Sequence, residues 1–154
     1  MKVEFINPFI KATTGVLKTL TDIDFVTGKP YVKASPYTAK EVLIIVGITG
    51  EIRGQVVITL DVAFAKKMAS MMMMGMPVDE LDELSKSALS ELGNMIMGNT
   101  ATLLFNEGVS VDITPPTLMV GQQLSISSGS MRTICIPLTA PGLGELILDL
   151  SIKE

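Results

Sequence analysis

The sequence predicts an α+β fold in which an antiparallel or mixed sheet is covered by helices, one of them long. Candidate strands and helices arrive in runs instead of a strict βαβ alternation. Two pairs of candidate strands are joined by short connections that contain glycine, at Gly50-Glu51 and Pro141-Gly142, as in antiparallel hairpins. The longest helical pattern lies between these two pairs and provides a face that can pack on the sheet.

An amphipathic helix is expected first, from Val3 to Leu20, because apolar residues recur at intervals of three and four. Pro8 fits only near the first turn of this helix, where its missing N–H costs no hydrogen bond. Glu4 and Asn7 form a Glu-x-x-Asn pair here, but Asn7 directly precedes Pro8 and is better explained as an N-cap or helix-start residue. We therefore favour a structural explanation for this pair.

Alternating and β-branched segments predict six strands, and a proline pair at Pro115-Pro116 interrupts the second half of them. The predicted strands are Tyr31–Tyr37, Glu41–Thr49, Ile52–Leu60, Val109–Thr114, Thr133–Leu138 and Glu145–Ile152.

Two further helices are predicted between the strands. Asp61 is a suitable N-cap for a helix that runs to about Met74, and Gly75 suits its C-terminal cap. The longest helical pattern runs from Asp79 to about Asn106, with acidic residues in its first turn, where they favour the positive end of the helix dipole.

Composition fits one domain over residues 1–154 and excludes several classes of function. The net charge is −4 and Lys and Arg form no cluster, so we expect no nucleic-acid binding. The longest apolar stretches, Val42–Ile48 and Met68–Met76, fall short of the ~20 residues of a membrane-spanning helix, so no membrane association is expected. The N-terminus lacks the layout of a signal peptide, which leads us to expect a cytoplasmic protein.

Histidine is absent, which excludes Ser-His-Asp and Cys-His catalysis and most zinc sites. The lone cysteine, Cys135, lies between two isoleucines and is expected to be a buried thiol. The methionines of Met71–Met74 lack Cys or His partners, so packing or a partner contact is favoured over metal binding. We expect this chain to bind no cofactor and no metal.

The long helix is expected to bury a stripe centred on Leu92, taking ~100° per residue. The predicted buried side comprises Leu81, Leu84, Ala88, Leu89, Met95, Ile96, Asn99 and Leu103. Opposite this stripe lie Glu91 and Asn94, which are neighbours on the helix surface because they are three residues apart. The residues around them are small, so Glu91 and Asn94 form a projection that another surface can approach, not a pocket.

A Glu-x-x-Asn spacing alone is weak evidence, since both residues are common on solvated helix faces. Two details favour a function: Asn is a poor helix former, and Gly93 and Gly98 each cost the helix about 1 kcal/mol relative to Ala. Such costs in one helix often mark a close contact or a functional site.

The segment from Leu81 to Asn99, LDELSKSALSELGNMIMGN, resembles the signature of the CheC/CheX/FliY phosphatase family. The core of the motif is Ser87-x-x-x-Glu91-x-x-Asn94. Further similar segments occur in the same order along nearly the whole chain, namely TGKP, GITGEIRG, MMGM and VDITPPT. One full motif is present, as in CheX-like members, whereas CheC-like members often carry two.

The resemblance implies a phosphatase that hydrolyses the aspartyl phosphate of a phosphorylated CheY-like response regulator. Glu91 and Asn94 would be its catalytic residues, with Asn94 orienting the attacking water and Glu91 pairing with a lysine of the regulator. Mg²⁺ would belong to the partner's active site, which fits a chain without histidine. The family also implies a homodimer.

Two other functions stay open at this point. A non-catalytic binding module could use the same helix to dock a response regulator or a flagellar-switch component. A purely structural dimer could join edge strands into a continuous sheet, although this leaves Glu91 and Asn94 without a purpose.

Overall fold

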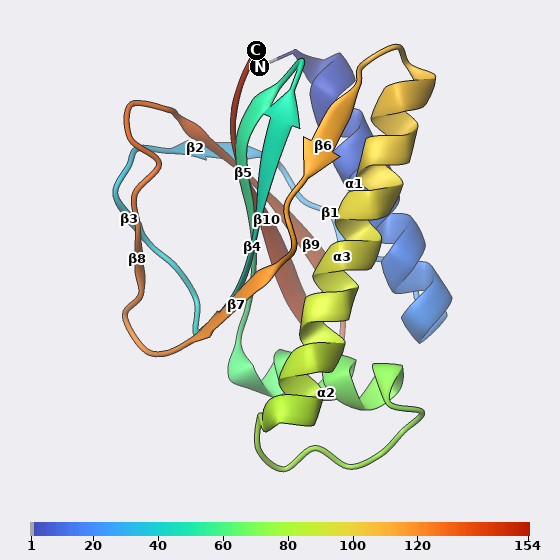
Figure 1. Cartoon of the computed structure of the whole chain (residues 1–154). Coiled ribbons are helices and arrows are strands. Elements are labelled where there is room, and N and C mark those ends of the chain that lie inside the picture. Colours follow the sequence, from blue (N-terminus) through green and yellow to red (C-terminus); the bar gives the residue numbers. More distant parts are fainter. Residues whose placement is uncertain (1) are drawn as a thin grey trace.

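Residues 2–154, the part of the chain described by a computed structural model, contain three helices and ten strands (Figure 1). The helices are α1 (Val3–Thr21), α2 (Val62–Met72) and α3 (Glu83–Asn106). The strands are β1 (Val26–Thr27), β2 (Tyr31–Lys33), β3 (Tyr37–Thr38), β4 (Val42–Gly50), β5 (Arg53–Leu60), β6 (Val111–Ile113), β7 (Thr117–Val120), β8 (Ser125–Ile126), β9 (Thr133–Ala140) and β10 (Gly144–Lys153).

Eight of these strands form one antiparallel sheet in the order β1-β9-β10-β5-β4-β6, with β2 also on β9 and β7 also on β4. The predicted hairpins are confirmed, since β4 pairs with β5 and β9 pairs with β10. The α+β class is therefore confirmed. The sequence missed β1, β7 and β8, which are too short to show an alternating pattern.

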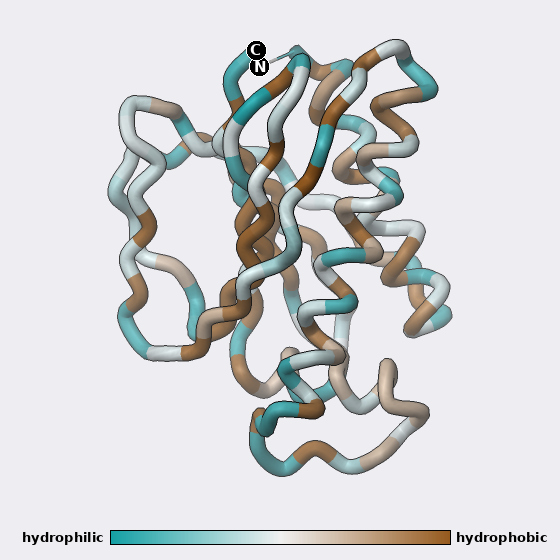
Figure 2. The backbone as a smooth tube through the Cα atoms, viewed as in Figure 1, coloured by the Kyte–Doolittle hydropathy of each residue, from teal (hydrophilic) through white to brown (hydrophobic). Residues whose placement is uncertain are grey.

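Helices α1 and α3 cover one face of the sheet, and α2 lies at one end of it (Figure 1). The side chains of β4 alternate accordingly: Ile44, Val46 and Ile48 join the main core beneath the helices, whereas Leu43 joins a second, smaller cluster. Figure 2 shows the hydrophobic residues concentrated along the central strands, between the helices and the ribbon on the opposite side.

The second face of the sheet is covered by the two-stranded ribbon β3–β8. Tyr37 and Ile126 pair in this ribbon and pack with Leu43 and Val57. The predicted strand Tyr31–Tyr37 is therefore wrong as a single element, because its first part pairs with β9 and its last part with β8. Pro36 lies at the break and has no N–H to donate to a ladder.

The long helix α3 begins at Glu83, four residues later than predicted, and its 24 residues extend for about 36 Å. Its N-cap is Asp82, whose side chain accepts a hydrogen bond from the Ser85 backbone N–H at 2.9 Å. The Ser85 hydroxyl in turn accepts from the Asp82 N–H at 2.8 Å, which completes a capping box. These bonds lower the pKa of the Asp82 carboxyl.

Helix α2 starts as predicted, with the Asp61 side chain accepting from the Phe64 N–H at 2.7 Å. It ends at Met72, two residues early, and Gly75 closes the turn by donating to the Ser70 carbonyl at 2.8 Å.

In α1 the bounds are close to the prediction, but Pro8 lies in the second turn, not the first. Asn7 is consequently inside the helix and not its N-cap, which is Lys2. The carbonyl that Pro8 leaves without an intrahelical donor belongs to exposed Glu4 and can be solvated.

Candidate functional site

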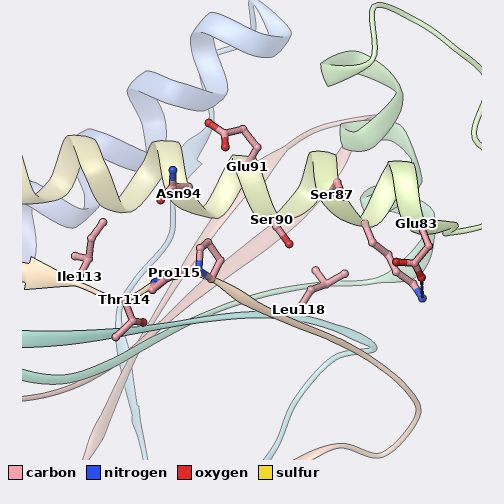
Figure 3. Close-up of a pocket in the computed structure, with 11 residues that line it drawn as sticks. Glu83, Ser87, Ser90, Glu91, Asn94, Ile113, Thr114, Pro115 and Leu118 are labelled. Carbon is pink, nitrogen blue, oxygen red and sulfur yellow. Dashed lines mark ion pairs between the residues drawn. The ribbon is translucent and has the colours of Figure 1, made fainter.

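Glu91 and Asn94 both lie exposed on α3, one turn apart, as predicted. Within residues 2–154 neither side chain makes an ion pair or a hydrogen bond to another residue. A carboxylate and an amide with all their hydrogen-bonding capacity open to solvent are available to a partner. Figure 3 shows Glu91 projecting from the helix on the side away from Pro115.

The buried stripe of α3 is rotated relative to the prediction. Its centre lies roughly 70° from Leu92 around the helix, and it includes Gly93 and Met97. Leu84 and Asn99, which were predicted to be buried, are exposed. The rotation follows from packing on two sides, because α3 contacts α1 as well as strands β4, β6 and β7.

A groove runs along α3 beside the two site residues, which the sequence did not predict (Figure 3). Its second wall is the crossing from β6 to β7. The groove is lined by Glu83, Lys86, Ser87, Ser90, Glu91, Asn94, Ile113, Thr114, Pro115, Pro116 and Leu118. The sequence predicted a projection at this place, and the structure shows that this projection is one wall of an open groove. The Pro115-Pro116 pair, which interrupts the strand pattern in the sequence, belongs to the other wall.

Thr114 fixes the second wall to the sheet. Strand β4 pairs with β7 as far as Ile45 and with β6 from Ile48 onward, which leaves a gap between the two ladders. Thr114 fills the gap: its hydroxyl accepts from the Gly47 N–H at 2.8 Å, and its own N–H donates to the Gly47 carbonyl at 3.0 Å. A Cβ at Gly47 would lie 3.1 Å from the Thr114 methyl group, so the missing side chain makes room for this contact.

Gly93 sets the height of α3 above the sheet. A Cβ at this position would lie 2.5 Å from the Cγ2 of Ile44 and 3.9 Å from Pro116. The glycine is therefore explained by a close approach of helix and strand. Gly98 has open space around it, with nothing within 4 Å of a built Cβ.

The charges along the groove are sparse. Lys86 lies 3.9 Å from Glu83, one turn before the site, and Figure 3 shows this ion pair at the end of the groove. Glu91 is the unpaired acid of the groove. The site therefore presents one free negative charge and one neutral amide to an approaching surface.

Other candidate sites receive little support. In the described part of the chain, no three Asp, Glu or Cys side chains are grouped so that they could hold a metal ion. Cys135 is buried, as predicted, and burial raises the pKa of its thiol to about 12. Glu4 and Asn7 are exposed on α1, where Glu4 lies 3.8 Å from Lys2. Over residues 2–154, no helix is long and apolar enough to cross a bilayer.

Comparison with known proteins supports the resemblance found in the sequence. The family model described as "Chemotaxis phosphatase CheX" matches residues 42–139, which include the groove and both site residues. The chain belongs to the CheX family of chemotaxis phosphatases.

Several similar proteins match this chain over their full length. The CheY-P phosphatase CheX of Thermotoga maritima is 34% identical over 154 residues, which cover 100% of this chain and 99% of the relative. A CheC-like superfamily protein of Shewanella has the same fold, with a TM-score of 0.88, 25% identity and complete coverage of both chains. The CheX of Borrelia burgdorferi, solved in a complex with CheY, BeF3 and Mg²⁺, matches with a TM-score of 0.84 and 29% identity, over 99% of this chain and 100% of that one.

Proposed function

We propose that this chain hydrolyses the aspartyl phosphate of a CheY-like response regulator by inserting Glu91 and Asn94 into the regulator's active site. The observation that carries the proposal is that these two side chains are exposed, unpaired and adjacent on α3. The Thermotoga relative is a CheY-P phosphatase, and the Borrelia relative was solved in complex with CheY, BeF3 and Mg²⁺.

The reaction needs little from this chain because an aspartyl phosphate is an activated mixed anhydride. Water attacks phosphorus as the bond to the aspartyl oxygen breaks, which yields the free carboxylate and inorganic phosphate and releases one proton. In this proposal, this chain binds no cofactor, and Mg²⁺ in the partner's site neutralises charge on the phosphoryl oxygens. What remains is to hold a water in line with phosphorus, a contribution that can be worth several kcal/mol.

An amide at position 94 suits this task for two reasons. The Asn94 side chain offers both a donor and an acceptor, so it can orient a water and contact a phosphoryl oxygen. It is also neutral, whereas a carboxylate would repel the phosphoryl group. Glu91 supplies the negative charge that pairs with a lysine beside the acyl phosphate, which fixes the register of α3 in the partner's site.

The test is the decay of a CheY-type regulator phosphorylated with acetyl phosphate and Mg²⁺, with and without this chain. We expect Asn94→Ala, Asn94→Asp and Glu91→Ala each to abolish most of the acceleration. Asn99→Ala is the matched control, because Asn99 is exposed on another side of the same helix. Wild-type acceleration by Asn94→Ala would refute the mechanism.

Binding of the phosphorylated regulator without faster decay would instead support the non-catalytic binding module. We also propose that the protein is a cytoplasmic homodimer, as the family resemblance implies. Light scattering of the purified chain tests the homodimer, and a monomeric mass at micromolar concentration would contradict it.

A further inference from the structure

An apolar patch lies exposed where α2 leads into α3. Leu84, in the first turn of α3, is 58% exposed, and Met76 in the segment before it is 53% exposed. We call these two residues the Leu84 patch. A hollow beside it is lined by Met76 and Leu84 together with Pro77, Val78 and acidic residues of the same turn. Exposed apolar groups gathered in this way, with a polar rim, are typical of interaction sites.

The turn before the Leu84 patch is fixed by its backbone. Met74 has the left-handed conformation, with φ of 59°, which is uncommon for a residue with a side chain. The turn around it is closed by hydrogen bonds from Gly75 to Ser70 and from Met76 to Met73, at 2.8 and 3.3 Å. A conformation that costs free energy is thus kept in a turn whose outermost side chain is an exposed methionine.

The Leu84 patch continues the surface of the candidate site. Leu84 and Glu91 are seven residues apart on α3, which places them two turns apart on nearly the same face, about 10 Å from each other. Ser87 is exposed between them. A stable complex buries about 800 Å² on each partner, far more than Glu91 and Asn94 can supply. A protein that contacts both site residues is therefore close enough to cover Leu84 as well.

We propose that the Leu84 patch is the apolar anchor by which the same response regulator binds, separate from the two residues that act on its phosphate. This inference rests on the proposed function. Acidic residues surround the patch, namely Asp79, Glu80 and Glu83. The matching surface of the regulator should therefore present apolar side chains flanked by Lys or Arg. Methionine suits such an anchor because its flexible side chain adapts to the surface it meets.

Measurements of affinity and of rate distinguish the role of the Leu84 patch from that of Glu91 and Asn94. The probe for affinity is a CheY-type regulator loaded with BeF3⁻ and Mg²⁺, and the rate is phosphate loss at saturating concentration of this chain. We expect Leu84→Ser, and separately Met76→Ser, to raise the Kd about tenfold with the saturating rate unchanged. Asn94→Ala should show the opposite pattern, a lost rate with little change in Kd.

Phe105→Ser is the matched control, since Phe105 is 68% exposed at the other end of α3. An unchanged Kd for Leu84→Ser, or an equal increase for Phe105→Ser, would overturn the anchor while leaving the proposed function intact. If the wild-type chain binds but does not accelerate decay, the proposed function fails and the Kd of Leu84→Ser still decides the anchor. Wild-type chain that does not bind the regulator refutes both. If Leu84→Ser instead turns a dimer into a monomer, the patch belongs to self-association and the inference is wrong.

Discussion

Replacement of Gly93 by alanine tests whether close packing on Ile44 sets the position of α3. The new Cβ would lie 2.5 Å from the Cγ2 of Ile44, closer than carbon atoms can approach. Ile44 cannot yield easily, because it is fully buried in strand β4 and its β-branched side chain has few rotamers. Either Ile44 or the whole helix must therefore shift.

The magnitude follows from two opposing effects. Alanine at a helix interior is favoured over glycine by about 1 kcal/mol. Overpacking a rigid core position costs about 1–3 kcal/mol. We therefore expect Gly93→Ala to lower the free energy of unfolding by about 1 kcal/mol, within a range of about 0–2.

Gly98 provides a matched control in the same helix. Nothing lies within 4 Å of a Cβ built on Gly98, so Gly98→Ala should gain the helix propensity without a clash, about 1 kcal/mol. The two variants should differ by about 2 kcal/mol, or roughly 4–8 °C in Tm for a chain of this size. Urea unfolding and thermal melting, followed by circular dichroism, measure the difference.

A double-mutant cycle identifies the partner. Ile44→Ala alone should be strongly destabilising because it leaves a cavity, but combined with Gly93→Ala its cost should fall, since the new methyl group enters that space. Equal stabilities of Gly93→Ala and Gly98→Ala, or an additive cycle, would refute the argument that this contact sets the height of α3.

Three other perturbations follow from hydrogen bonds and burial. Asp82→Ala removes the capping box of α3 and should lower the free energy of unfolding, measured in urea, by about 1 kcal/mol. Asp79→Ala, outside the helix, should change it by less than about 0.5 kcal/mol. Equal effects of the two substitutions would contradict the observed start of α3. Thr114→Val leaves the Gly47 N–H without its acceptor and should lower the free energy of unfolding by about 1 kcal/mol. Thr114→Ser keeps the hydroxyl and should retain most of the wild-type stability. If Thr114→Ser is as unstable as Thr114→Val, the hydroxyl is not the cause. Burial raises the pKa of the Asp149 carboxyl, so the native state holds this proton more tightly than the unfolded state, and the wild type loses stability as pH rises from the unfolded pKa of about 3.9 through the native pKa. The stability of Asp149→Asn relative to the wild type should therefore increase as pH rises towards neutral. A stability difference that does not change with pH would contradict this.

The patterned elements could be predicted from the sequence, and the irregular ones could not. Strands β4, β5, β9 and β10 are long enough to alternate between two buried faces, and Asp61 marks the start of α2 by its capping chemistry. Strands of two to four residues are too short to show an alternating hydrophobic pattern. Which strands they pair with depends on segments that are distant from them in the sequence.

The start of α3 was missed because three acidic residues precede it and each favours a helix N-terminus. Only the capping box with Ser85 selects Asp82 among them, and a Ser at the third helical position is a weaker sequence signal than Glu or Gln. The buried stripe was misplaced because it was centred on Leu92, which lies at one edge of the buried residues. Gly93 and Thr100, which are not strongly apolar, extend the stripe on the other side.

The outward position of Glu91 and Asn94 was predictable because periodicity alone separates them from the core. The groove beside them was not, because it depends on how the segment after β6 crosses the sheet. The close fit of Gly93 also required the structure, since a glycine in a helix can serve a helix contact, a docking surface or neither.

The same strand, β4, sets the position of both walls of the groove. Ile44 sets the position of α3 through Gly93, and Gly47, three residues further along β4, holds the opposite wall through Thr114. Those two supports are about 10 Å apart along one extended segment, a distance that backbone geometry keeps nearly constant. Both walls therefore take their position from one short segment of β4, so a change confined to the far edge of the sheet, at β1 and β9, should leave the width of the groove unchanged.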